Sequence, residues 1–315
     1  MAVKSKSNKI EIIRVYDAPV KIVWDAWHDP KQVGQWWGPR GFTLTTHSKD
    51  LRTGGTWHYT MHGPDGTDYI NKTKYLEVEP YARMVYDHGG NDERAPLFRV
   101  TANFIDLKGK TRLEMSFELP TPEAAEETKK FIKKANGNST WDRLGEFLTK
   151  ELSGKEQFVI NRTFEAPIAT VREMWTNPKH LSKWMGPAGS EMELFRADIH
   201  VGGSIFYGMS FNGGKMHGRA DYREVGADRI VYVQQFCDEH EKPARHPLAS
   251  TWPMAMITVV RFYEEGPDRT RVALTWEPIE GSTPEEMETF IKARGGMHQG
   301  WEGSFDKLEE YLAQR

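Results

Sequence analysis

The chain has 315 residues, of which 42 are Lys or Arg and 45 are Asp or Glu. This near balance argues against a nucleic-acid-binding protein, whose sequence would carry a clear basic excess. With 38% hydrophobic residues, a single cysteine and no run of about 18 apolar residues, the chain is expected to be a globular cytoplasmic protein without disulfides, Cys-rich zinc sites or membrane spans.

The first predicted element is a short strand followed by two short helices. Residues 10–16 are rich in β-branched side chains and partly alternating, which predicts a strand. Pro19 suits the first turn of a helix, and apolar residues then recur at helical spacing up to His28. A second short helix is predicted over residues 31–37, and the Gly-Pro pair at 38–39 ends it.

Six β-like segments and a helix complete this part of the chain. The segments are Phe42–Lys49, Thr56–Met61, Tyr69–Val78, Arg83–Asp87, Phe98–Asp106 and Thr111–Leu119. The last alternates strictly between apolar and polar residues, which indicates a sheet with one face in water. A long helix opens at Thr121-Pro122-Glu123, and Gly137 is expected to weaken its middle.

The same order of elements then occurs a second time. Shifted by 148 residues, the segment 12–41 falls on 160–189, and the identical positions are Ile12, Arg14, Ala18, Pro19, Val23, Trp27, Pro30, Lys31, Trp36, Gly38, Pro39 and Gly41. A repeat of this length indicates a duplicated domain and not a solenoid. We therefore predict one domain over residues 1–153 and another over 154–315, with an insertion around 236–252 in the second.

The closing helix of the second copy carries clear helix signals. Thr283 and Glu286 have the spacing of a capping box. Trp301, Phe305 and Leu308 then form one apolar stripe, while a Gly-Gly pair at 295–296 is expected to weaken the helix. An antiparallel sheet with one apolar face packs against such a stripe. The sequence thus predicts an α+β fold, twice, with a possible cavity between sheet and helix.

Several motifs agree in order and spacing between the copies and with a known family. They are Trp36-Trp37-Gly38-Pro39, Gly54-Gly55 and Thr140-Trp141-x-Arg143-Leu144, then Trp184-Met185-Gly186-Pro187, Gly202-Gly203 and His246-Pro247. Over residues 9–150 and 156–314 the chain resembles tandem activator-of-heat-shock-protein-ATPase homologue-like (AHSA-like) domains of the START-like, helix-grip SRPBCC superfamily. The resemblance implies, in each copy, a curved antiparallel sheet wrapped on a long C-terminal helix, with two short helices after the first strand. It also implies a deep pocket for apolar small molecules.

Aromatic and Met residues on the predicted strands and closing helices are candidates for the pocket walls. They are Trp57, Tyr59, Tyr75, Phe117 and Trp141 in the first copy, and Phe206, Tyr207, Met209, Tyr222, Trp276 and Trp301 in the second. Met256 and Met297 are similar candidates. A wall of this kind suits a mostly apolar ligand that few polar contacts orient, and methionine favours an adaptable pocket.

Residues with catalytic or metal-binding chemistry form no standard signature. The sequence has no serine-hydrolase elbow, zincin motif, Walker loop or dinucleotide-binding glycine motif. His58 and His62 share a strand face, but a metal would need Asp65 or Asp68 as well, so no metal or cofactor is predicted. Glu77 and Glu224 would act as general acids or bases only if they faced the cavity.

Three functions follow from these features. The leading hypothesis is a non-catalytic binding protein whose partner is a lipid-like or aromatic small molecule. The second is an enzyme of the polyketide cyclase or hydratase type that uses a pocket carboxylate or histidine. The third, implied by the namesake of the family, is a co-chaperone-like activator of an ATPase.

Overall fold

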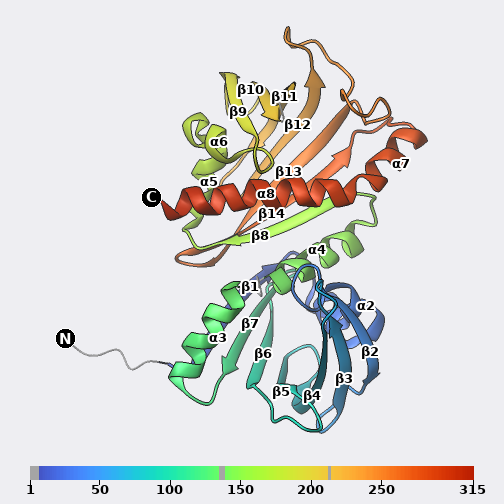
Figure 1. Cartoon of the computed structure of the whole chain (residues 1–315), viewed down its shortest axis with the longest axis vertical. Coiled ribbons are helices and arrows are strands. Elements are labelled where there is room, and N and C mark those ends of the chain that lie inside the picture. Colours follow the sequence, from blue (N-terminus) through green and yellow to red (C-terminus); the bar gives the residue numbers. More distant parts are fainter. Residues whose placement is uncertain (1–6, 135–138, 212–213) are drawn as a thin grey trace, which may run out of the picture. The chain divides into compact units, whose positions relative to one another are not determined.

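The chain divides between Ser153 and Gly154 into two units, each with its own sheet and its own hydrophobic core (Figure 1). The computed structural model describes residues 7–134, 139–211 and 214–315. Each unit is a seven-stranded antiparallel sheet with helices, so the predicted α+β class with two helix-grip domains is confirmed.

The first domain contains seven strands and four helices in its described part. In chain order they are β1 (Lys9–Tyr16), α1 (Val20–His28), α2 (Pro30–Trp36), β2 (Thr43–Lys49), β3 (Thr56–His62), β4 (Asp68–Glu79), β5 (Arg83–Gly90), β6 (Phe98–Asp106), β7 (Thr111–Glu118), α3 (Pro122–Lys134) and α4 (Ser139–Ser153). The order across the sheet is β1-β7-β6-β5-β4-β3-β2. Only the step from β1 to β2 crosses the sheet, and α1 and α2 make this crossing.

The second domain repeats this arrangement. Its elements are β8 (Phe158–Phe164), α5 (Ile168–Thr176), α6 (Pro178–Trp184), β9 (Glu191–Ala197), β10 (Ser204–Phe211), β11 (Gly214–Val225), β12 (Arg229–Cys237), β13 (Ala255–Gly266), β14 (Arg269–Pro278), α7 (Pro284–Lys292) and α8 (Arg294–Ala313). The order across the sheet is β8-β14-β13-β12-β11-β10-β9. Residues 238–254 form a long connection between β12 and β13, where the sequence predicts an insertion.

The same contacts fix the two short helices in both domains. The indole N–H of Trp36 donates to the carbonyl oxygen of Ala26 at 3.1 Å, and that of Trp184 donates to Met174 at 3.1 Å. Both Trp side chains are fully buried, so each bond forms away from water and satisfies a polar group that would otherwise be costly to bury. These tryptophans hold each helix pair as a unit at one end of the sheet.

In the second domain two consecutive helices stand where the sequence predicts one long closing helix. In the second domain α7 ends at Lys292 and α8 begins at Arg294, and the expected weak pair at 295–296 lies inside α8. The capping box of Thr283 and Glu286 is confirmed, with bonds of 2.9 and 3.2 Å. In the first domain α3 is described up to Lys134 and α4 from Ser139, and Gly137 lies outside the described residues.

Figure 1 shows α8 running across one face of its sheet. Its buried side chains Met297, Trp301, Phe305 and Leu308 recur at helical spacing on the side that faces the core. No helix in the described ranges is long and apolar enough to span a membrane.

Candidate functional site

A cavity of about 390 Å³ lies in the second domain between the sheet and α8. Its lining comes from α5, α6 and the residues directly after it, the strands β9 to β14, the connection 238–254, and α8 with the residue before it. The lining residues are Trp175, Leu181, Met185, Gly186, Pro187, Met192, Ile205, Tyr207, Met209, Met216, His217, Ala220, Tyr222, Tyr232, Gln234, Phe236, His246, Trp252, Met256, Trp276, Ala293, Gly296, Met297, Gly300, Trp301 and Ser304. The volume lies in the range of small-molecule sites.

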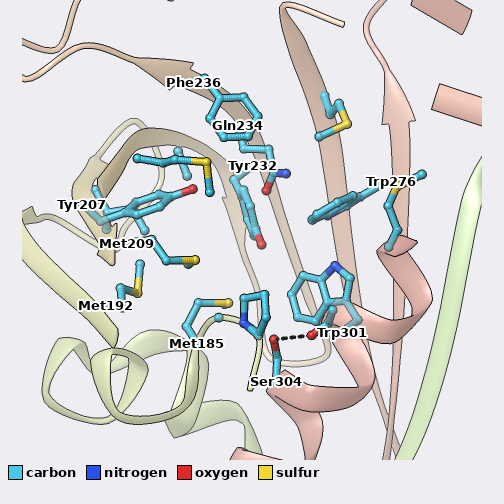
Figure 2. Close-up of a pocket in the computed structure, with 18 of the residues that line it drawn as sticks. Met185, Met192, Tyr207, Met209, Tyr232, Gln234, Phe236, Trp276, Trp301 and Ser304 are labelled. Carbon is cyan, nitrogen blue, oxygen red and sulfur yellow. Dashed lines mark hydrogen bonds between the residues drawn. The ribbon is translucent and has the colours of Figure 1, made fainter. Parts of the chain in front are cut away.

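Methionine and aromatic side chains divide the cavity wall between them. Figure 2 shows Met185, Met192 and Met209 beside Tyr207 on one side, and Trp276 and Trp301 on the other. The two indoles meet edge to face with their ring centroids 5.6 Å apart. Thioether sulfur is polarisable and contacts aromatic rings favourably. The wall therefore offers an adaptable side and a rigid aromatic side.

The polar groups of the wall are mainly hydrogen-bond donors. In Figure 2 the hydroxyl groups of Tyr207 and Tyr232 point into the cavity. Burial raises the pKa of Tyr207 to about 12 and also raises the pKa of Tyr232, so both phenols keep their protons at neutral pH. The side-chain oxygen of Gln234 accepts a bond from Thr258 at 3.2 Å, which leaves its amide N–H groups as donors.

A histidine in the wall is also held as a donor. The Nδ1 atom of His246 accepts the backbone N–H of Leu248 at 3.0 Å, so the neutral ring carries its proton on Nε2. Burial lowers the pKa of His246, which favours this neutral form. The ring lies between Phe236 and Trp252, with centroids 4.6 and 5.8 Å away.

The connection 238–254 carries part of the wall and is fastened to α7. The guanidinium of Arg245 forms an ion pair with Glu286 and donates to the carbonyl oxygen of Trp252 at 3.1 Å. The hydroxyl groups of Thr251 and Thr289 lie 2.8 Å apart. These contacts hold His246 and Trp252 in place over the cavity.

The absence of a side chain at Gly218 leaves room for the ring of Tyr207 in the cavity wall. A Cβ atom at Gly218 on β11 would lie only 2.4 Å from the ring and hydroxyl of Tyr207 on β10. Real Cβ atoms do not approach this closely, so the tyrosine lies across the neighbouring strand only because residue 218 has no side chain.

The first domain contains a smaller cavity of about 150 Å³. Its lining residues are Trp37, Gly38, Pro39, Met61, Tyr86, His88, Phe98, Val100, Phe117, Thr140 and Trp141. A cluster of indole rings packs beside it. The ring of Trp37 lies 5.5 Å from Trp27, 5.1 Å from Trp57 and 6.2 Å from Trp141, centroid to centroid.

The candidates from the sequence divide into three groups. Tyr207, Met209, Tyr222, Trp276 and Trp301 line the second-domain cavity, whereas Phe117 and Trp141 line the first-domain cavity. Trp57, Tyr59 and Tyr75 are buried in the first core and border neither cavity. Phe206 lies on the other face of β10, 5.0 Å from the ring of Phe195. These four residues are thus not among those that line the two cavities.

Sequence reasoning missed several wall residues. Met192, Met216 and Gln234 line the cavity from β9, β11 and β12. Gln234 and Tyr232 are two residues apart and share one face of β12, so alternation along this strand is the signal that could have found both. His246 and Trp252 belong to the insertion, whose path no periodicity could predict.

The candidates for acid–base or metal chemistry lie away from the cavities. Glu77 pairs with Arg83 at 2.8 Å, and Glu224 pairs with Arg229 at 3.0 Å; neither glutamate lines a cavity. His62 lies 2.6 Å from Asp68 on an exposed face. Within residues 7–134, 139–211 and 214–315 no cluster of three or more His, Cys, Asp or Glu side chains could hold a metal.

Comparison with known proteins gives one family for both halves. The family model described as "Activator of Hsp90 ATPase homolog 1-like protein" matches residues 17–149 and again residues 165–313. No protein among the curated sequences matches the chain.

Solved structures resemble this chain over about half its length. A protein from Arthrobacter aurescens is 23% identical, covers 47% of this chain and 90% of its own, and has a TM-score of 0.43. A protein from Staphylococcus epidermidis is 25% identical, with coverages of 48% and 95% and a TM-score of 0.42. An AHSA1-like protein from Aeromonas hydrophila is 21% identical, with coverages of 46% and 94% and a TM-score of 0.37.

Proposed function

Because this chain belongs in both halves to the Activator of Hsp90 ATPase homolog 1-like family, we propose that its second domain binds an uncharged, mainly aromatic small molecule. The site is the second-domain cavity. Members of the family commonly bind small ligands, and the proposal assigns this role to a particular half of the chain.

The chemistry of the cavity lining carries the proposal. Among the described residues that line it there is no Lys, Arg, Asp or Glu. A charged ligand group would lose its hydration on entry and find no ion to pair with, which is costly. Apolar surface gains about 25 cal/mol for each Å² removed from water. The cavity thus favours an apolar ligand and disfavours an ionised one.

The hydrogen-bond donors on the cavity wall restrict the chemical class of the ligand further. Tyr207, Tyr232 and Gln234 present O–H or N–H groups, and buried donors require acceptors. A ketone, quinone or ether oxygen on an aromatic ring system would supply them. The ligand class we propose is therefore an aromatic molecule with at least one neutral acceptor oxygen.

The wall favours binding over catalysis. A general base needs a lone pair directed at the substrate, whereas Nδ1 of His246 is already engaged by the backbone and Nε2 carries a proton. The tyrosines stay protonated, and Glu77 and Glu224 pair with arginines elsewhere. The other histidine among the lining residues, His217, has its ring beside Phe195 and Phe206, with centroids 5.9 and 6.0 Å away. The non-catalytic role is therefore the better proposal.

Two measurements test this function. Native mass spectrometry of freshly purified protein, followed by organic extraction, should find a neutral aromatic compound bound to the chain. Titration with prodan, an uncharged naphthalene ketone with environment-sensitive fluorescence, should show saturable binding. If the protein carries no compound and prodan does not bind, the proposal is wrong.

A chaperone partner and a cytoplasmic location stay predictions from the sequence. An assay of ATPase stimulation with purified chaperone would test the former, and cell fractionation the latter.

A further inference from the structure

Two large aromatic side chains distinguish the first domain from the second. Trp37 follows α2 directly, and Met185 has the same place after α6. Trp57 is the second residue of β3, and Ile205 is the second residue of β10. Both pairs keep the spacing of 148 residues that relates the two copies. Met185 and Ile205 line the second-domain cavity, so their counterparts stand where a ligand would contact the first domain.

The side chain of Trp37 occupies the middle of the first domain's aromatic cluster. Its ring centroid lies 5.1 Å from Trp57, 6.5 Å from Tyr59 and 6.2 Å from Trp141, and the side chain is only 6% exposed. It also borders what remains of the first-domain cavity, about 150 Å³ against about 390 Å³ in the second domain. An indole is larger than the thioether chain of Met185, and it fills space that the second domain leaves open.

The side chain of Trp57 is fixed from both sides. Its ring stacks on Tyr59 with the centroids 4.1 Å apart, and Nζ of Lys49 lies 3.5 Å from the ring centroid. The same nitrogen donates to the hydroxyl of Tyr75 at 2.9 Å. Burial lowers the pKa of Lys49 to about 7, so at neutral pH only part of the molecules carry the charge that attracts a cation to an indole face. The position of Lys49 is Ala197 in the second copy, which has no equivalent clamp.

We propose that the chain binds one ligand, in the second domain, and that Trp37 and Trp57 are the residues that close the first domain to it. This inference rests on the proposed function. The two tryptophans take the place of the ligand, so the first domain is packed as a core where the second is hollow.

The first experiment measures how many prodan molecules bind to the wild-type chain. Isothermal titration calorimetry and fluorescence titration should both give one per chain. Two per chain would overturn the inference and leave the proposed function standing. No binding at all would overturn the proposed function, and the inference with it.

Variants then exchange the residues between the two domains. W37M/W57I should create a second site and raise the stoichiometry to two. M185W/I205W should remove the native site or weaken it by about tenfold or more. The control is W24M, which removes an indole of the first core that packs on Tyr81 and Phe104 away from the cavity; its stoichiometry should stay at one.

Circular dichroism establishes that each variant is folded before binding is measured. If folded W37M/W57I still binds one prodan, or folded M185W/I205W binds with unchanged affinity, the assignment of these residues is wrong. Should W37M/W57I not fold, the wild-type stoichiometry and M185W/I205W still decide the question.

Discussion

The phenol of Tyr232 is expected to form a hydrogen bond with a polar group of the ligand. The hydroxyl of Tyr232 points into the cavity from β12, and a neutral hydrogen bond contributes about 0.5–1.5 kcal/mol. Y232F should therefore weaken prodan binding by about two- to tenfold, as measured by calorimetry. The control ligand is the same dimethylaminonaphthalene without its ketone, whose affinity should not change. An equal loss for both ligands would contradict a hydrogen bond to the ketone.

His88 should make the first domain sensitive to acid. Burial lowers its pKa from 6.5 to about 4, and its ring stacks on Phe98 with the centroids 5.0 Å apart. Between these pH values the unfolded chain takes up a proton that the folded chain does not, so stability falls as the pH drops below about 6.5. His88 comes two residues after Tyr86, which pairs with Tyr75, and Gln234 has the same place after Tyr232, which pairs with Tyr222. H88Q, which installs this glutamine, should remove about 1–2 kcal/mol of the loss between pH 7 and about pH 5.

Urea unfolding followed by tryptophan fluorescence measures this effect at the two pH values. The matched control is H58Q, on β3 of the same sheet. If wild type and H88Q lose the same stability on acidification, the histidine does not carry the effect.

At the scale of single residues, strand alternation predicted much of the cavity wall. It could not distinguish side chains that border a cavity from side chains that fill the space. Tyr207 and Phe206 are adjacent on one strand, so only one of them could face inward, and that is Tyr207. Trp57 does face inward, as alternation indicates. Whether an inward ring borders a cavity or fills it depends on residues distant in sequence, such as Lys49, which the pattern does not contain.

The insertion of the second domain is the element expected to control ligand exchange. It brings His246 and Trp252 to the cavity wall, and Arg245 ties it to α7 through Glu286. R245M should loosen this attachment and raise the dissociation rate of prodan about two- to tenfold, since related complexes differ mainly in their dissociation rates. Stopped-flow fluorescence measures that rate.

The control for this prediction is K292M. Lys292 lies on α7, and its ion pair is with Glu288 of the same helix at 2.5 Å. Its removal should leave the dissociation rate unchanged. A similar change in both variants would mean that helix charge, and not the attachment of the insertion, governs release.

At the scale of elements, the sequence predicted where a helix begins better than where it is interrupted. The capping box at Thr283 fixes where α7 begins, because the signal lies within four residues. The break between α7 and α8 at Ala293 carries no such signal, and the Gly-Gly pair that seemed to mark it lies inside α8. Packing against the sheet overrides the weak helix propensity of glycine there.

Across the whole molecule, ligand binding should change only one half of the chain. A ligand at 100 times its Kd stabilises the state that binds it by about 2.7 kcal/mol. Hydrogen–deuterium exchange of the full chain with saturating prodan should therefore slow in peptides from residues 154–315, above all in β10–β12 and α8, and stay unchanged in residues 7–134. Equal protection in both domains would contradict a single site.

The duplication was visible in the sequence because identical residues recur at a fixed spacing. The structure has two compact units, which meet between Ser153 and Gly154. The different interiors of the two copies were not visible in the same way. Trp37 and Trp57 look like ordinary core residues in a linear pattern, and the inference that they replace open space draws on their ring contacts in three dimensions.

The size of ligand that the second-domain cavity accepts depends on the absence of a side chain at Gly218. A Cβ atom of alanine there would lie 2.4 Å from the ring of Tyr207, so the ring would have to shift, and a shift toward the cavity would reduce the space for a ligand. Large ligands would then bind more weakly, while small ligands would still bind. A single methyl group on the neighbouring strand would thus change the selectivity of the cavity without contacting the ligand.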